Sequence, residues 1–180
     1  MNKWIPGAAA LFAAASAAAE VTSSAEQGFV VEHEVVVAAG RTDAWQAAVG
    51  SIGLWWSSDH TISGDARNLR IEAHALGCFC ERLSAHGEVV HLLVTFVNPG
   101  VLLRMTGGLG PLGLMGTSGN MTWEFLEAGD DTRIRFTYAV GGYHPDGLDS
   151  IAPGVDFVIG EALARLGALI ETGDPEPVEP

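Results

Sequence analysis

Two thiols, a carboxyl group and an imidazole lie close together in the middle of this sequence. Cys78, Cys80 and Glu81 stand in one short apolar run, and His91 stands in the next, with turn residues between the two runs. Side chains of these types bind metal ions, exchange protons and act as nucleophiles. What they can do together depends on which of them face one another across the two runs.

The pairing of the two runs has two alternatives. With a turn at residues 84–87, Cys80 faces His91 across the hairpin, and Glu81 faces Val90. A loop that is one residue longer places Glu81 opposite His91 instead. Either register puts a thiol or a carboxylate beside the imidazole.

The two cysteines form a Cys-x-Cys pair. On a regular strand, residues two apart point to the same face with roughly 6–7 Å between them, which is long for a disulfide. We therefore expect Cys78 and Cys80 to be buried thiols, although an oxidising compartment would favour a disulfide. Because a site of these two residues and His91 lacks the two-residue spacer and a fourth ligand, we predict no metal. Nothing indicates a lowered thiol pKa either, so we assign no catalytic residue and no cofactor.

The apolar runs predict the elements that position these groups. Alternating residues and turn signals predict strands, and three- or four-residue spacing predicts helices. The predicted strands are 29–37, 68–75, 78–83, 88–97, 101–105, 120–126 and 132–140; the predicted helices are 44–49, 51–56 and 153–171. This order indicates an α+β domain, in which a curved antiparallel sheet of about 6–7 strands wraps around the long C-terminal helix and encloses a cavity.

Aromatic and apolar residues elsewhere are candidates for the cavity wall. Trp55 and Trp56 are adjacent, so both cannot point inward, and Tyr138 alternates with core residues, so its hydroxyl group needs a buried partner or a ligand. Residues 106–119 contain six glycines among apolar residues and predict a long flexible loop, for which a gate at the cavity mouth is the functional alternative. The predicted ligand-binding residues are Trp55, Trp56, Glu81, His91, Leu109, Tyr138 and Tyr143.

The two ends of the chain predict export and a flexible tail. Lys3, the apolar run 5–19 and the small residues before Glu20 form the pattern of a signal peptide, so we expect a periplasmic or secreted protein. The predicted parts are a signal peptide at 1–19, a flexible segment at 20–28, the folded domain at 29–172 and a disordered acidic tail at 173–180. The net charge of −13 excludes nucleic acid as a partner. No other apolar run is long enough to predict stable membrane insertion after cleavage.

Several short segments carry a resemblance to a known superfamily. They are Asp43-Ala44-Trp45, Trp55-Trp56, Asn98-Pro99-Gly100-Val101-Leu102-Leu103, Gly107-Gly108-Leu109-Gly110, Met121-Thr122-Trp123 and Asp131-Thr132-Arg133-Ile134, followed by the C-terminal helix. In this order they resemble the START-like, or SRPBCC, superfamily with its helix-grip fold, in the branch of heat-shock-protein ATPase activator homologues and polyketide cyclase-like proteins. The resemblance covers about residues 29–172.

The resemblance implies a domain that binds a small hydrophobic or amphipathic molecule in an internal cavity. Two alternatives come with it. One is an enzyme of the cyclase or hydratase type that uses Glu81, His91 or Tyr138 for acid–base work. The other is a protein-interaction module with an exposed apolar patch. Because no strong catalytic motif occurs, binding without catalysis is the favoured interpretation, and the sequence identifies no protein partner.

Overall fold

The computed structural model describes residues 19–177, so the predicted signal peptide lies outside the described part except for its last residue. The strands are β1 (Ala19–Ala25), β2 (Gly28–Val37), β3 (Leu69–Ile71), β4 (Cys78–Arg82), β5 (Glu88–Asn98), β6 (Leu102–Gly107), β7 (Gly116–Ala128) and β8 (Asp131–Tyr143). The helices are α1 (Arg41–Gly50), α2 (Ile52–Trp55) and α3 (Ala152–Thr172), with 3₁₀ turns η1 (Ser58–His60), η2 (Ala66–Asn68), η3 (Gly110–Leu114) and η4 (Leu148–Ser150).

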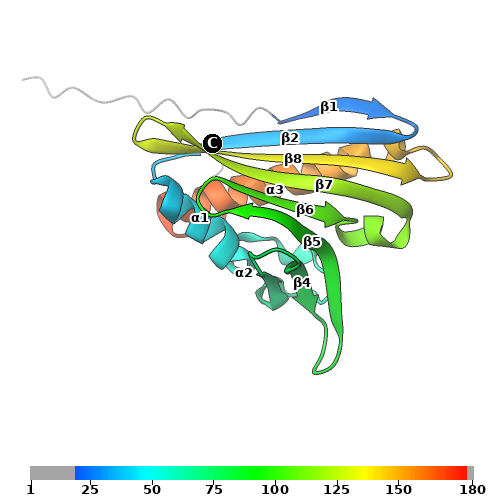
Figure 1. The fold of residues 1–180 in the computed structure, drawn as a ribbon, viewed down its shortest axis with the longest axis horizontal. Coiled ribbons are helices and arrows are strands. Elements are labelled where there is room, and N and C mark those ends of the chain that lie inside the picture. Colours follow the sequence, from blue (N-terminus) through cyan, green and yellow to red (C-terminus); the bar gives the residue numbers. More distant parts are fainter. Residues whose placement is uncertain (1–18, 178–180) are drawn as a thin grey trace, which may run out of the picture.

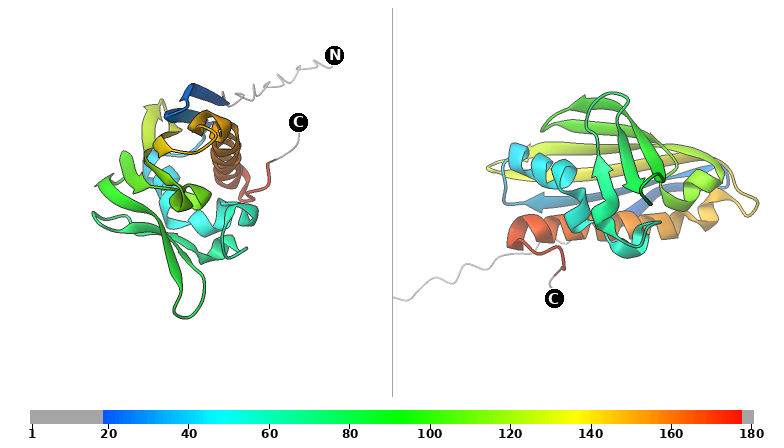
Figure 2. Two further views of the ribbon diagram at one scale, coloured as in Figure 1. Left: turned by 90° about the vertical axis from the view of Figure 1, so that its right-hand side faces the viewer. Right: turned by 90° about the horizontal axis from the view of Figure 1, so that it is seen from below.

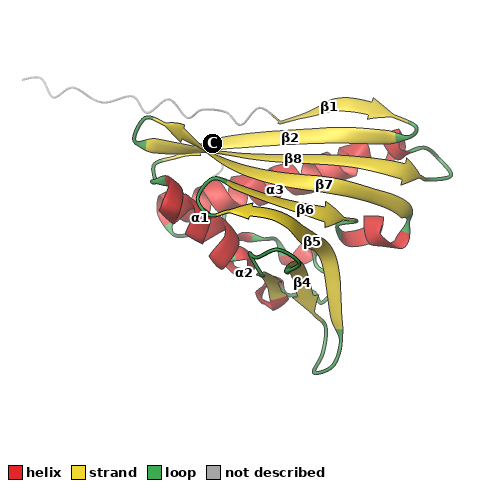
Figure 3. Ribbon diagram, in the orientation of Figure 1, coloured by secondary structure: helices red, strands yellow, loops and turns green. Residues whose placement is uncertain are grey.

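The predicted α+β architecture is confirmed. One antiparallel sheet of eight strands, in the order β1-β2-β8-β7-β6-β5-β4-β3, packs against α3 (Figure 1). The short helices α1 and α2 follow the second strand: α2 contacts β3 and α3, and α1 contacts β3, β7, β8 and α3 (Figure 3). Within residues 19–177, no helix is long and apolar enough to cross a membrane.

The N-terminal strand was not predicted. Residues 20–28 were expected to be flexible, but the structure places residues 19–25 in β1, which pairs with β2 along its length. The hydroxyl group of Thr22 also donates a hydrogen bond to the Val30 carbonyl oxygen (3.2 Å). Because this stretch has only two β-branched residues, Val21 and Thr22, its own pattern is weak, and the open edge of β2 decides its conformation.

Two connections differ in length from the prediction. The strand predicted at 68–75 ends at Ile71, because the following residues form a tight turn in which Leu76 has a positive φ of 67°. The glycine-rich loop predicted at 106–119 is shorter, because β6 and β7 continue into it and pair Gly107 with Gly119. Glycine composition resembles that of a loop, but the ladder hydrogen bonds to the neighbouring strands hold these residues extended.

Helix α3 covers the concave face of the sheet and packs most closely on β2 (Figure 2). Its buried side chains include Ile159, Leu163 and Leu166. Two glycines allow the close approach: a Cβ atom at Gly160 would lie 2.6 Å from the His33 ring, and one at Gly167 would lie 3.1 Å from Val35. The sheet curves away from the helix toward β4 and β5, so the two layers separate on that side (Figure 2).

Helix α3 ends at a left-handed glycine. Gly173 has a φ of 81°, and its backbone N–H donates to the Leu169 carbonyl oxygen. Of the predicted disordered tail, the structure describes residues up to 177, where Glu176 pairs with Arg165 at 2.8 Å. The last three residues lie outside the described part.

We expect Gly173→Ala to lower the free energy of unfolding by about 1 kcal/mol, because alanine is strained in the left-handed region. For a domain of this size, about 1 kcal/mol corresponds to a fall in Tm of about 2–4 °C. Gly154→Ala is the matched control: this exposed glycine lies in the first turn of the same helix without a positive φ. The control should leave Tm unchanged or raise it, and equal destabilisation by both variants in thermal unfolding would contradict the assignment.

Candidate functional site

A cavity of about 710 Å³ lies between the sheet and the N-terminal half of α3. Most of its wall is apolar. The lining residues are Trp56, 59–62, Leu69, Phe79, 89–91, 108–115, Tyr138, Ser150, Ile151, Gly154, Val155, Val158 and Ile159. Residues 108–115 connect β6 to β7 and are called the flap below. A second hollow, of about 450 Å³, lies over β1, β2, β7 and β8, and no titratable side chain lines it.

A β-bulge places His91 in the cavity wall. Strands β4 and β5 pair Cys80 with Val90 and Phe79 with Leu92, so His91 is the extra residue of β5. As a result, His91 and Leu92 are both buried although they are consecutive. Both registers predicted from the sequence assume a regular ladder. Glu81 in fact pairs with Val89, and the bulge brings the imidazole beside its carboxylate.

Glu81 lies directly behind His91 and is completely buried. Its Oε2 accepts hydrogen bonds from His91 Nε2 at 2.9 Å and from the Ile62 backbone N–H at 3.0 Å, and its Oε1 accepts one from the Ser63 backbone N–H. Burial alone would raise the pKa of the Glu81 carboxyl group, but the hydrogen bonds from Ser63, Ile62 and His91 hold it below its usual value of 4.5. Glu81 is therefore a buried carboxylate at neutral pH.

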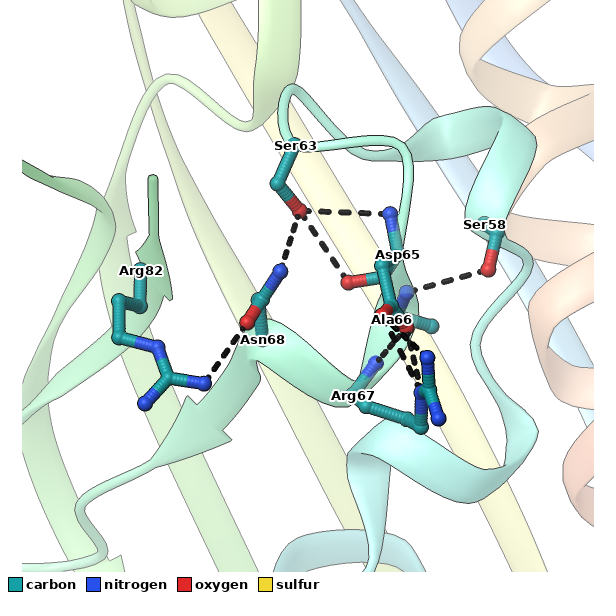
Figure 4. A network of polar contacts seen from close by, with 7 residues as sticks. All are labelled: Ser58, Ser63, Asp65, Ala66, Arg67, Asn68 and Arg82. Carbon is teal, nitrogen blue, oxygen red and sulfur yellow. Dashed lines mark hydrogen bonds and ion pairs between the residues drawn. The ribbon is translucent and has the colours of Figure 1, made fainter. Parts of the chain in front are cut away.

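The loop that donates these two backbone N–H groups is itself braced by polar contacts (Figure 4). The Ser63 hydroxyl group is bonded to the backbone of Asp65 and to the Asn68 amide, the latter at 3.2 Å. Arg82 in turn donates to the Asn68 side-chain oxygen at 3.0 Å, and Ala66 N–H donates to the Ser58 hydroxyl group at 3.1 Å. This network fixes the donors that face Glu81, so the carboxylate does not depend on His91 alone.

Tyr138 lies on the wall, but the protein itself occupies its hydroxyl group. The hydroxyl donates to the Gly107 carbonyl oxygen at 2.9 Å and accepts from the Leu109 backbone N–H at 3.1 Å. Burial raises the pKa of Tyr138 to about 12, and the Leu109 bond offsets only part of that rise. The side chain therefore anchors the base of the flap and is a neutral phenol at physiological pH.

Two histidines that sequence reasoning did not single out pair with α3. His60 lines the cavity and meets Glu161 at 2.8 Å, while the buried His33 meets Asp156 at 2.8 Å beneath the helix. Both partners are more than 100 residues away in the sequence, since the separations are 101 and 123 residues. Because only the packing of α3 brings these histidines and carboxylates together, no local sequence pattern predicts the two pairs.

The other predicted ligand-binding residues divide between the wall and the rest of the fold. Trp56 and Leu109 lie on the wall. Trp55 does not: it is buried in the aromatic core, where its ring nitrogen donates to the Ala47 and Ala48 carbonyl oxygens at 3.2 Å. Tyr143 belongs to the end of β8 and not to a loop, and it is 72% exposed and outside the described wall.

The expectation of two free thiols is wrong. Cys78 and Cys80 form a disulfide, and their Cα atoms are 5.4 Å apart. That separation is shorter than the roughly 6–7 Å of a regular strand, because β4 is not fully extended where the ladder shifts register. Both sulfur atoms are held in this bond, so neither forms a thiolate beside His91 for metal binding or nucleophilic attack.

The anchor of the flap can be tested by alkaline titration. The chain has two tyrosines, so Tyr143→Phe leaves Tyr138 as the only phenol. We expect its phenolate absorbance to appear with a midpoint of about 12, against an ordinary value of 10.0. The pKa of Tyr138 is higher in the folded protein than in the unfolded chain. The contribution of Tyr138 to the stability of the fold is therefore complete below pH 10.0 and is lost as the pH rises toward 12.

Circular dichroism along the titration would show whether the fold persists. The control is the double variant Tyr138→Phe/Tyr143→Phe, which should show no phenolate absorbance. A midpoint near the ordinary value with the fold intact would mean that the hydroxyl group reaches water and does not anchor the flap.

The sequence matches no protein-family model and no curated protein. Solved structures do match. A conserved Enterococcus faecalis protein of unknown function, EF2215, superposes with a TM-score of 0.58 at 16% identity, over 91% of this chain and 83% of the other. DynU16, from the dynemicin biosynthetic locus, superposes with a TM-score of 0.57 at 17% identity, over 83% of this chain. This chain spans about half of DynU16, 49% of its length.

The Aha1 dimer structure from Colwellia psychrerythraea gives a TM-score of 0.51 at 15% identity, over 80% of this chain and 97% of the other. At such identities the likeness concerns the fold alone. It agrees with the arrangement of the sheet, the two short helices and α3. The chain therefore has the helix-grip fold that the resemblance of its sequence segments implied.

Proposed function

We propose that this domain binds a small hydrophobic or amphipathic molecule in the cavity between the sheet and α3. The observation that carries the proposal is the cavity itself, about 710 Å³ with a mainly apolar wall. Binding sites for small molecules have volumes of roughly 300–1,000 Å³ and combine apolar walls with a few placed polar groups. Helix-grip domains of the SRPBCC type typically bind their ligands in this cavity.

The polar groups of the wall support an amphipathic ligand in particular. His91 and Tyr138 are buried in the wall, whereas Asp59 is exposed at its edge. The apolar residues of the flap and of α3 surround the rest of the space, with Leu112 and Ile159 both buried. A molecule with an apolar body and a polar end fits this distribution better than a uniformly apolar one.

The second candidate function is an enzyme of the cyclase or hydratase type. The observation that favours it is the buried Glu81–His91 pair, an imidazole held by a carboxylate at 2.9 Å in a cavity wall. Tyr138 does not take part in acid–base work at neutral pH in this proposal, because its hydroxyl group is bonded to the flap and its pKa is about 12.

Ligand binding can be tested with a variant that fills the cavity. Val155 lines the cavity from α3, so we expect Val155→Trp to displace the ligand. Ala164→Trp is the control, because Ala164 is exposed on the same helix and outside the described wall. Purified, delipidated proteins would be incubated with a lipid and metabolite extract and examined by native mass spectrometry.

The unmodified protein and Ala164→Trp should retain a bound apolar molecule, and Val155→Trp should lose at least about 90% of it, a tenfold change that corresponds to about 1.4 kcal/mol. Ligand-free masses for all three proteins would contradict the proposal. Equal retention by all three proteins would mean that the molecule binds outside this cavity.

We also propose that the domain acts after export, in the periplasm or outside the cell. The signal-peptide pattern of residues 1–19 supports this, and the Cys78–Cys80 disulfide supports it independently, because disulfides persist in oxidising compartments. Cleavage before Glu20 would leave nearly all of β1 in the mature chain.

The test of export is the mass of the chain recovered from a bacterial host after fractionation. We expect a periplasmic or secreted species that begins at Glu20. Leu11→Arg interrupts the apolar run and should hold the full-length chain in the cytoplasm. A full-length, cytoplasmic chain without this substitution would contradict the proposal.

A further inference from the structure

His91 presents one ring nitrogen that the protein does not use. Nε2 is bonded to Glu81, and the structure gives Nδ1 no hydrogen-bond partner among residues 19–177. The ring lies in the cavity wall and is 6% exposed, with Phe79 edge-on beside it at 5.6 Å between ring centroids. Nδ1 is not among the fully enclosed polar atoms without a partner, so a ligand group in the cavity can reach it and form a hydrogen bond with it.

The other polar side chains of the wall are already satisfied or lie in water. His60 Nε2 is bonded to Glu161, and water can reach the rest of this ring because its side chain is 25% exposed. Tyr138 is bonded to the flap, and the Thr61 and Ser150 hydroxyl groups donate to backbone carbonyl oxygens. Asp59 is exposed. Among the described residues of the wall, the buried His91 side chain is therefore the one that offers an unpartnered ring nitrogen, Nδ1, to a ligand.

The surroundings of Glu81 determine what kind of partner Nδ1 needs. Backbone N–H groups can only donate, and one of them faces each carboxylate oxygen, from Ile62 and Ser63. This arrangement favours the ionised carboxylate, which can only accept a hydrogen bond. Nε2 of His91 must then carry the proton. In the neutral imidazole, the other nitrogen, Nδ1, has a free lone pair and is an acceptor.

We propose that the ligand of this cavity is an apolar alcohol or phenol whose hydroxyl group donates a hydrogen bond to Nδ1 of His91. The proposal rests on the proposed binding function and specifies its ligand class. Glu81 is a positioning residue, because it fixes the tautomer and orientation of the ring without contacting the ligand. An ether or a ketone of the same shape has no donor and leaves Nδ1 unsatisfied.

Two isomers provide a matched pair of probes. Decan-1-ol and 1-methoxynonane have the same formula, but only the alcohol is a hydrogen-bond donor. Calorimetric titration at about pH 8, above the ordinary imidazole pKa of about 6.5, would give both dissociation constants. We expect the alcohol to bind about three- to tenfold more tightly than the ether, the range of one neutral hydrogen bond.

The substitution His91→Phe keeps a ring of similar size and removes the acceptor. In this variant the preference for the alcohol should fall to about one. His86→Phe is the matched control, because His86 is exposed in the turn between β4 and β5 and should keep the preference. Long-range ¹⁵N–¹H NMR of the unmodified protein gives a reading that does not depend on a variant: the proton should be on Nε2, and the Nδ1 resonance should move with the alcohol and not with the ether.

Equal affinity of the unmodified protein for both isomers would overturn this inference and leave the binding function standing. A proton on Nδ1 in the neutral ring would also overturn it. If neither isomer binds, the alcohol class is excluded; the retention experiment with Val155→Trp then decides whether the cavity binds any ligand.

Discussion

The close contact between α3 and β2 is the constraint on which the cavity depends. Gly160 and Gly167 let the helix backbone approach His33 and Val35, and the contact of the buried His33 with Asp156 at 2.8 Å joins the two elements. The helix is straight and the sheet is curved, so close packing along one edge forces separation along the other. The space opens beneath β4 and β5, on the side where the sheet turns away from α3, and residues of η1, the flap and α3 complete its wall.

A second constraint is that polar groups inside this space have to be satisfied. The bulge at His91 turns an imidazole inward, which would be unfavourable against an apolar core without a partner. Glu81 provides that partner, and the backbone of Ile62 and Ser63 provides partners for Glu81. The network thus connects the chain after α2 with β4 and β5, and it leaves the other nitrogen of a ring in the cavity wall without a partner among the described residues.

The sequence predicted the elements better than it predicted their register. Alternation and turn residues identified the strands from residue 78 to residue 105 and the long helix, because those patterns are local. The short edge strand at residues 19–25 depends on the free edge of β2, and the bulge at His91 depends on how two strands twist together. Neither leaves a periodic signal. The same reasons explain the site: Glu81, His91 and Tyr138 were selected as buried polar groups, but their partners come from backbone N–H and carbonyl groups that no sequence pattern specifies. The disulfide was missed because the prediction assumed a fully extended β4.

The position of the Tyr138 anchor limits how the cavity can exchange its contents. Its two hydrogen bonds hold Gly107 and Leu109, at the base of the flap, and breaking both would leave a buried hydroxyl group unsatisfied at a cost of about 1–3 kcal/mol. Farther along the flap, Leu112 is buried and its carbonyl oxygen accepts a hydrogen bond from Thr117, but Leu114 is 92% exposed, so little packing holds the residues around Leu114. Regions with few buried contacts open at lower free energy than anchored ones. The exposed part of the flap around Leu114 is therefore expected to open at lower free energy than its base, which Tyr138 holds on the sheet.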